Sequence, residues 1–154
     1  MFKHSNRLTW WAAAMLPVMF LACGTVREIA GPKGPSWPLR VSADIPSAQG
    51  IVKVLSTQGP KQKVRIEVQY LPPPDRVSAH ATTYVVWLVP AGENEPRNFG
   101  ALRLGVSLKG ELEIQTPFPE FEVFVTAEAT ATVTRPTNRQ LLMASVRSAS
   151  RATP

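Results

Sequence analysis

The amino-acid sequence predicts an all-β fold, a single antiparallel β-sandwich of about seven to nine short strands. Short runs rich in Val, Ile, Thr and aromatic residues recur between residues 39 and 146. Clusters of Gly and Pro separate these runs, as turns do between strands. No window shows a strong amphipathic helix pattern, and we find no internal repeat. We therefore expect residues 39–146 to form one sandwich domain.

The first half of this domain contains four strand candidates. Leu39–Ala43 and Gly50–Thr57 are short β-rich runs, and Gly59-Pro60 follows the second. Lys63–Tyr70 alternates between apolar and polar residues, which is the pattern of a half-buried strand. Thr82–Val89 is almost continuously apolar or β-branched, so we expect a central strand that is covered on both faces.

Five further candidates complete the predicted set. They are Phe99–Leu104, Val106–Leu108, Glu111–Gln115, Phe121–Val133 and Gln140–Val146. Phe121–Val133 is the longest, and it alternates apolar residues with Thr and Glu. Gln140–Val146 contains good helix formers, so a helix is the alternative there, but the segment is short for one. The number of strands and the turns between them favour an immunoglobulin-like sandwich.

Both ends of the chain are predicted to lie outside the sandwich. In residues 1–22, Lys3 and Arg7 precede an apolar run of 15 residues, Leu8–Ala22, which is the pattern of a secretory signal peptide. This run is shorter than the roughly 20 residues of a membrane-spanning helix. Residues 23–38 are rich in Gly and Pro and predict an extended tether. Residues 147–154 have no apolar rhythm and predict a frayed tail.

The apolar run ends in Leu21-Ala22-Cys23-Gly24, which resembles the lipobox of bacterial lipoproteins. The resemblance implies cleavage between Ala22 and Cys23 and attachment of lipid to the Cys23 thiol. Cys23 is the only cysteine of the chain, so it has no disulfide partner within it. The alternatives are an ordinary signal peptide and an uncleaved N-terminal anchor. We expect a lipid-anchored protein of the cell envelope, in the outer membrane or facing the periplasm if the host has an outer membrane.

Four short motifs follow one another in the second half of the chain. They are Tyr84-Val85-Val86-Trp87-Leu88-Val89-Pro90, Phe99-Gly100-Ala101-Leu102, Phe124-Val125-Thr126-Ala127-Glu128 and Arg135-Pro136-Thr137-Asn138. In this order they resemble the C-terminal extracytoplasmic β-sandwich of anti-sigma-K-type factors. The resemblance implies a fold signature made of Tyr84, Trp87, Pro90, Glu128 and Pro136.

The resemblance covers about half of the precursor and concerns the fold rather than an activity. Anti-sigma factors of that type carry an intracellular sigma-binding domain and a membrane helix before the sandwich. Here only a seven-residue basic segment precedes the apolar run. Binding of a sigma factor is therefore not carried over, and an extracytoplasmic sensor or regulator is kept as an alternative function.

The mature chain offers few groups for catalysis. His80 is its only histidine, and the nearness of Asp75 and Ser78 in one loop is not the geometry of a catalytic triad. An acidic cluster comprises Glu111, Glu113, Glu120 and Glu122. We interpret these carboxylates as solvent-facing charges rather than as an acid–base pair or a cation site. We expect no catalytic residue, no metal and no cofactor.

The two tryptophans of the mature chain have different expected roles. Trp87 lies within an apolar strand and should anchor the core. Trp37 lies between prolines in the predicted tether and is the candidate for contact with a partner, with capping of the sandwich edge as the alternative. Removal of residues 1–22 lowers the net charge from +6 to +4, and the dispersed basic residues form no nucleic-acid groove.

Together these observations predict a non-catalytic, lipid-anchored binding or accessory module of the cell envelope. The membrane is one expected partner, through the N-terminal lipid, and the other is a protein or another envelope component. The alternatives are the sensor or regulator and an enzyme.

Replacement of Cys23 tests the predicted anchor. We expect Cys23→Ser to abolish incorporation of labelled palmitate and to stop cleavage after Ala22, because the lipidated thiol is what the lipoprotein pathway processes. The protein should still be exported. Labelled lipid that remains on the variant would contradict the lipobox assignment, and Ser36→Ala serves as the matched control.

Overall fold

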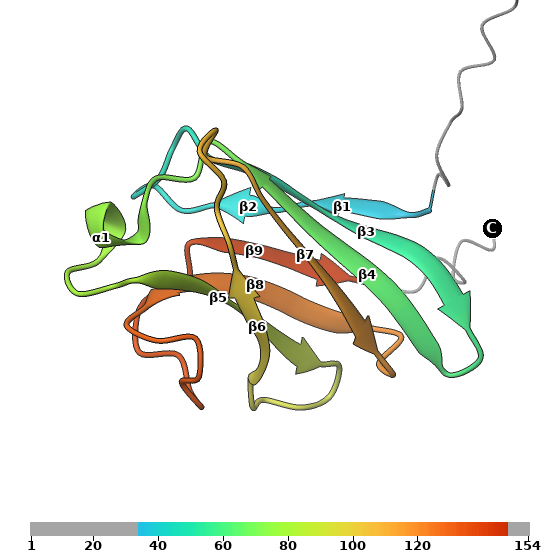
Figure 1. Cartoon of the computed structure of the whole chain (residues 1–154). Coiled ribbons are helices and arrows are strands. Elements are labelled where there is room, and N and C mark those ends of the chain that lie inside the picture. Colours follow the sequence, from blue (N-terminus) through green and yellow to red (C-terminus); the bar gives the residue numbers. More distant parts are fainter. Residues whose placement is uncertain (1–33, 148–154) are drawn as a thin grey trace, which may run out of the picture. The chain divides into compact units, whose positions relative to one another are not determined.

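Two antiparallel β-sheets packed face to face form the domain seen in the computed structural model, which describes residues 34–147 (Figure 1). This arrangement confirms the all-β sandwich that the sequence predicts. The predicted signal peptide, the cleavage and lipidation site at Cys23, most of the predicted tether and most of the predicted tail lie outside the described residues.

The first strand of the domain is divided between the two sheets. The four-stranded sheet has the order β1-β3-β4-β7, made of Ser36–Pro38, Gln49–Gln58, Lys61–Gln69 and Gly110–Thr116. The five-stranded sheet has the order β2-β9-β8-β5-β6, made of Arg40–Val41, Leu142–Val146, Phe121–Glu128, Thr83–Pro90 and Arg97–Leu102. If β1 and β2 are counted as one divided strand, β3 and β4 are the second and third strands, and they form a hairpin within one sheet. In an immunoglobulin constant domain the second and third strands lie in opposite sheets.

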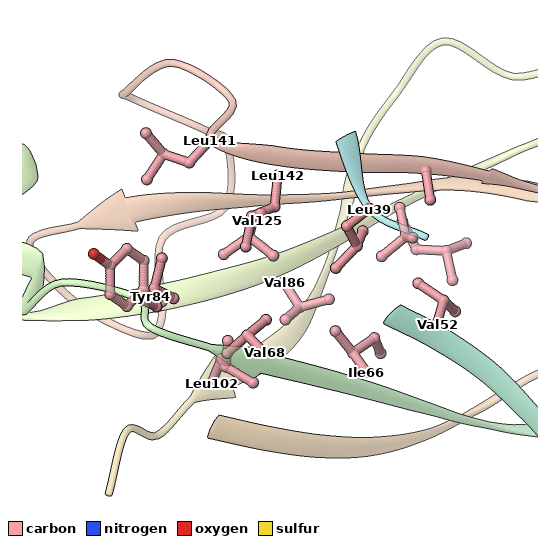
Figure 2. Packing of buried hydrophobic residues seen from close by; sticks show 14 of the residues in the cluster. Leu39, Val52, Ile66, Val68, Tyr84, Val86, Leu102, Val125, Leu141 and Leu142 are labelled. Atoms are coloured by element: carbon pink, nitrogen blue, oxygen red, sulfur yellow. The ribbon is translucent and has the colours of Figure 1, made fainter. Parts of the chain in front are cut away.

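Apolar side chains from both sheets fill the space between them (Figure 2). On β4 the predicted alternation holds, since Val64, Ile66 and Val68 are buried while the residues between them are partly exposed. Val86 of β5 and Val125 of β8 meet them from the five-stranded sheet. Burial of apolar area of this kind is the main favourable term in folding.

The outer face of the five-stranded sheet carries a second, smaller apolar cluster. Trp87, Val85 and Phe124 are buried there, and the rings of Trp87 and Phe124 stack with centroids 6.3 Å apart. Val133 covers this cluster from the segment after β8, which folds back over the sheet. β5 is therefore covered on both faces, as its continuous apolar sequence predicts.

Tyr84 and Pro90 occupy the two ends of β5 and are buried. The Tyr84 side chain lies in the core between the sheets, and its hydroxyl donates to the carbonyl oxygen of Pro72 at 2.7 Å. Burial, together with the negative charge of Asp75, raises the pKa of the Tyr84 hydroxyl above its ordinary value. The buried hydroxyl is thus held neutral and keeps its hydrogen bond.

Two predicted assignments are wrong, one because of a tertiary contact and one because of a local turn. Ser36–Pro38, which the composition assigns to the tether, form β1, since Trp37 packs against the core and pairs with Val52 of β3. Val106–Leu108 form a turn rather than a strand. The Leu108 N–H donates to the carbonyl oxygen of Gly105, and the Val106 side chain is fully exposed.

The last third of the chain also departs from the prediction in part. The predicted long strand ends at Glu128 instead of Val133, because the following residues leave the sheet to cover its outer face. The ambiguous segment 140–146 is a strand, β9, rather than a helix. Nearer the middle of the chain, the sequence analysis did not predict α1 (Pro74–Val77), a four-residue helix that begins at the last proline of residues 72–74.

The outer cluster makes Trp87 a stability determinant. We expect Trp87→Ala to lower the free energy of unfolding by about 3–5 kcal/mol, because it empties a fully buried site and removes an indole hydrogen bond to Thr126. Urea unfolding of the mature protein measures this change. Val106→Ala, at a fully exposed turn position, is the control and should change the free energy of unfolding by about 0.5 kcal/mol or less. A loss below about 1 kcal/mol for Trp87→Ala would contradict the packing described.

Candidate binding groove

An open groove lies at one end of the sandwich, between the edges of the two sheets. Its volume is about 660 Å³. We call it the Trp37 groove, and its principal lining residues are Trp37, Val54, Thr57, Pro117, Val146 and Arg147. These residues come from β1, β3, the β7–β8 connection, β9 and the residue after it. The groove is therefore a product of the tertiary fold.

The groove exists because the divided first strand is too short to cover either sheet edge. β1 pairs with β3 only from Ile51 to Lys53, and one further bond joins the Val54 N–H to the Pro35 carbonyl oxygen at 3.0 Å. β2 pairs with β9 only at Leu142 and Met143. Beyond these points no strand of the described part of the chain pairs with the edge of β3 or of β9 on this side.

Trp37 forms one wall of the groove. The register places it opposite Val52, on the side of β1 that faces the core, and its side chain is partly buried. The sequence singles out Trp37 as a partner contact, with capping of the edge as the alternative. In the structure its ring both packs on the core and lines the groove.

Hydrogen bonds fix the opposite wall. The Gln62 side-chain amide donates to the Phe118 carbonyl oxygen, and the Phe118 N–H donates to the Thr116 hydroxyl at 3.2 Å. The Arg97 guanidinium lies over the Phe118 ring, 4.9 Å from its centroid. These contacts hold the β7–β8 connection and thereby position Pro117 beside the groove.

Most of the groove lining is apolar or uncharged. Four prolines contribute, Pro35, Pro60, Pro117 and Pro119. Arg147 is the one charged residue that lines the groove in the described range, and it stands at the mouth where β9 ends. A surface of this composition suits a largely apolar ligand with an anionic group near Arg147.

A buried carboxylate lies on the other side of the molecule, under the segment that follows β8. Glu128 is fully buried and accepts hydrogen bonds from the Thr126 hydroxyl at 2.7 Å, the Thr137 N–H at 3.0 Å and the Thr137 hydroxyl. The Trp87 indole N–H donates to the Thr126 hydroxyl oxygen at 2.8 Å. The carboxylate thus joins β5, β8 and the covering segment.

Burial by itself raises the pKa of the Glu128 carboxyl, but the hydrogen bonds from Thr126, Thr137 and the Asn138 N–H outweigh it. The pKa of Glu128 therefore lies below its ordinary value, and the carboxylate is ionised at neutral pH. Both carboxylate oxygens accept hydrogen bonds from the protein, so Glu128 acts as a structural clamp between β8 and the segment after it.

Three of the five residues of the expected fold signature lie here, Trp87, Glu128 and Pro136. Trp87 and Glu128 belong to one hydrogen-bond chain, and Pro136 precedes Thr137, which closes it. Asn98 of β6 adds two bonds from its side-chain amide, to the carbonyl oxygens of Ala131 and Val133 at 2.9 and 2.7 Å. The sequence analysis did not identify Asn98, because nothing near it in the chain indicates that it binds a segment more than thirty residues away.

The loop that contains His80 does not line the Trp37 groove, and Ser78 joins it to the segment after β8. His80 is exposed, with a backbone φ of 66°, and Ser78 donates its hydroxyl hydrogen to the Asn138 side chain at 2.9 Å. Asp75 lies in the first turn of α1. Within residues 34–147 no hydrogen bond or ion pair joins His80, Ser78 and Asp75 as a triad, and the Ser78 hydroxyl already binds the segment after β8.

The acidic cluster of the sequence is divided between the two sheets. Glu111 and Glu113 lie on the outer face of β7, where Arg65 binds both, with Nε–Oε1 distances of 3.1 and 2.9 Å. Hydrogen bonds from Lys63 and then Arg65 lower the pKa of the Glu113 carboxyl. Glu120 and Glu122 belong to the β7–β8 connection and to β8. In the range 34–147 no three His, Cys, Asp or Glu residues gather as metal ligands, and no helix is long and apolar enough to cross a membrane.

The Glu128 clamp predicts a specific pH dependence. A carboxyl whose pKa is lowered by folding stabilises the protein at neutral pH, and this contribution is lost as the pH falls from about 4.3 through the folded-state pKa. We expect Glu128→Gln to cost about 1–3 kcal/mol at pH 7, because donors aimed at the carboxylate lose their partner.

The same measurement contains its own check. The difference in unfolding free energy between the wild type and Glu128→Gln should narrow as the pH is lowered below about 4. Glu95→Gln, at an exposed position, is the matched control and should show no such difference. If the difference in unfolding free energy between the wild type and Glu128→Gln stays constant from pH 7 to pH 3, the Glu128 carboxylate is not an ionised clamp.

The chain matches no protein-family model, and no curated protein is similar enough to count as a relative. What is known of the candidate site therefore comes from its own geometry. Two features stand out, a structural carboxylate clamp at Glu128 and an open, largely apolar groove beside Trp37.

Proposed function

We propose that the mature protein is a non-catalytic binding module of the cell envelope, anchored by lipid at Cys23, which holds a partner protein in the Trp37 groove. The anchor rests on the basic start, the apolar run and the Leu21-Ala22-Cys23-Gly24 sequence. Three acyl chains on one cysteine, as the lipobox resemblance implies, give stable membrane attachment. In a host with two membranes, Gly24 after the cysteine favours the outer one.

The observation that carries the binding function is the groove itself. It presents Trp37, Val54 and Val146 in one concave surface of a size that ligand sites typically have. Partly exposed tryptophan is strongly enriched among residues that dominate protein–protein affinity. The partly exposed ring of Trp37 gains free energy when a partner removes it from water.

The distribution of charge supports the same use of this end of the molecule. The ion pairs of Lys53, Arg65 and their partners lie on the outer face of the four-stranded sheet. That face is polar and satisfies its own charges. The walls of the groove, in contrast, are largely uncharged, so their desolvation on binding costs little, whereas Arg147 needs an anionic partner if it is buried.

Site-specific photocrosslinking in intact envelopes tests this function. A benzoylphenylalanine placed at Trp37 should give a discrete adduct of higher mass, because the side chain would touch the partner. The same group at the exposed position Thr132, on the segment after β8, is the matched control and should give none. Equal adducts at both positions, or none at Trp37, would contradict binding in the groove.

A further inference from the structure

We infer that the turn between β6 and β7 docks on an anionic lipid surface. We call this turn, Gly105–Leu108, the Val106 turn, and two basic residues, Arg103 and Lys109, flank it. The turn does not line the Trp37 groove. The inference therefore concerns a second surface of the molecule and does not rest on the binding function proposed above.

Main-chain hydrogen bonds hold the Val106 turn in a fixed shape. The Leu108 N–H donates to the Gly105 carbonyl oxygen at 3.1 Å, and the Gly105 N–H donates to the Lys109 carbonyl oxygen at 2.8 Å. Just outside the turn, Leu104 and Gly110 form an isolated bridge. The backbone groups of the turn are thus used within the turn itself.

The turn presents apolar side chains at positions where turns usually carry polar residues or glycine. Val106 is fully exposed, so its side chain protrudes from the domain. Leu108 is 38% exposed and has a φ of 57°, a conformation that is unfavourable for a bulky side chain and that glycine adopts freely. Neither residue type is explained by the local conformation of the turn.

Tyr70 lies beside the turn, where the chain leaves β4 (Figure 1). The next residue, Leu71, donates its N–H to the Leu108 carbonyl oxygen at 3.2 Å. Tyr70 is 52% exposed and also has a positive φ, 55°. Strained backbone of this kind clusters at functional sites. Val106, Leu108 and Tyr70 therefore form an exposed apolar tip rather than a covered part of the core.

The tip is flanked by positive charge. Arg103 and Lys109 are both exposed, and neither forms an ion pair within residues 34–147. The next acidic residue along the chain, Glu111, is bound by Arg65, with an Nε–Oε1 distance of 3.1 Å. The two cations beside the tip thus keep their charge available for an anionic ligand.

An anionic lipid surface suits this combination of groups. Apolar side chains enter the boundary between headgroups and acyl chains, while Lys and Arg meet the lipid phosphates. The tyrosine side chain favours the same boundary, because its ring is apolar and its hydroxyl is polar. An added strand of another protein would need unpaired main-chain groups, whereas the turn bonds those of Gly105 and Leu108 internally.

β4 separates the tip from the Trp37 groove. The strand begins at Lys61, next to Pro60 of the groove, and ends one residue before Tyr70. At about 3.3 Å per residue its length is roughly 30 Å. Docking of the tip would therefore hold the groove away from the lipid. Residues 24–35 join Cys23 to β1, and a chain of that length extends to at most about 40 Å, so an anchor at Cys23 permits docking.

A fluorescent probe on the turn tests the docking. We expect nitrobenzoxadiazole on Val106→Cys of the mature protein to emit at shorter wavelength with phosphatidylglycerol vesicles, and brominated acyl chains to quench it, because the probe enters the lipid. The same probe on Thr132→Cys, an exposed position on the segment after β8, is the matched control and should show neither effect. The unsubstituted protein, labelled in parallel, corrects for reaction at Cys23. Equal quenching at both positions, or none at position 106, overturns the inference.

Charge variants of the labelled protein test the recognition of anionic lipid. Lys109→Gln should lower the ratio of docked to undocked protein about fivefold, which is the contribution of one cation near an anionic leaflet. Lys61→Gln removes an equally exposed cation at the far end of β4 and should leave this ratio unchanged. Vesicles of phosphatidylcholine should not dock the tip. Equal docking on both lipids overturns the anionic specificity.

Two further measurements separate docking from folding and from binding of a protein. Val106→Asp, with the probe moved to Ser107→Cys, should abolish docking without lowering the urea midpoint, because the Val106 side chain is exposed. Benzoylphenylalanine at position 106 in intact envelopes should crosslink to lipid, and a discrete protein adduct instead would assign the tip to a protein and overturn the inference. Adducts at Trp37 are independent of these outcomes, so loss of lipid docking leaves the function of the groove in place.

Discussion

The covering of both faces of β5 is the constraint on which the rest of the structure depends. One face of this strand, with Tyr84 and Val86, meets the four-stranded sheet, and the other, with Trp87, needs a separate cover. The segment after β8 supplies that cover, so β8 must end at Glu128 and the chain must turn back over the sheet. Nine residues C-terminal to Glu128, Thr137 returns to bind its carboxylate. The covering segment is thus tied to the strand that it follows.

A buried carboxylate is an expensive way to hold a loop, and the structure shows how the cost is offset. An ionised group in an apolar surrounding is stable only when hydrogen bonds replace its hydration. Glu128 receives them from Thr126 on its own strand and from Thr137 and Asn138 on the covering segment. Asn138 further bonds the Ala127 carbonyl oxygen at 2.7 Å. The network therefore fixes one conformation of the segment, and two residues of the expected fold signature, Trp87 and Glu128, belong to it.

The two ends of the sandwich differ because the first strand is divided. The chain crosses from one sheet to the other at Leu39. As a result, β1 and β2 each pair with only a few residues of the neighbouring strand. The chain gains a connection between the sheets, and within residues 34–147 no strand pairs with the rest of these two edges. The Trp37 groove is the space between them. An open edge beside an apolar hollow is a hazard for aggregation in a free protein and a binding site in one that has a partner.

The fold class and the central strand were determined by the sequence itself. Alternation on β4 and continuous apolarity on β5 are local patterns, and local patterns report which faces of a strand are buried. The expected burial of Trp87 followed from the same pattern. Its position on the outer face did not, since a continuous apolar run does not say what covers each side.

Only the tertiary structure decided the groove and the clamp. The sequence indicated Trp37 as a candidate contact, but it did not indicate Val54, Pro117 or Val146. These four groove residues come from four separate segments of the chain, so no local pattern connects them. Composition assigned Ser36–Pro38 to the tether, and pairing with β3 made them a strand. Alternation alone extended β8 to Val133, and burial of the Trp87 cluster ended it at Glu128. In each case the free energy of a long-range contact outweighed a local preference, and such contacts are not encoded in any short window of sequence.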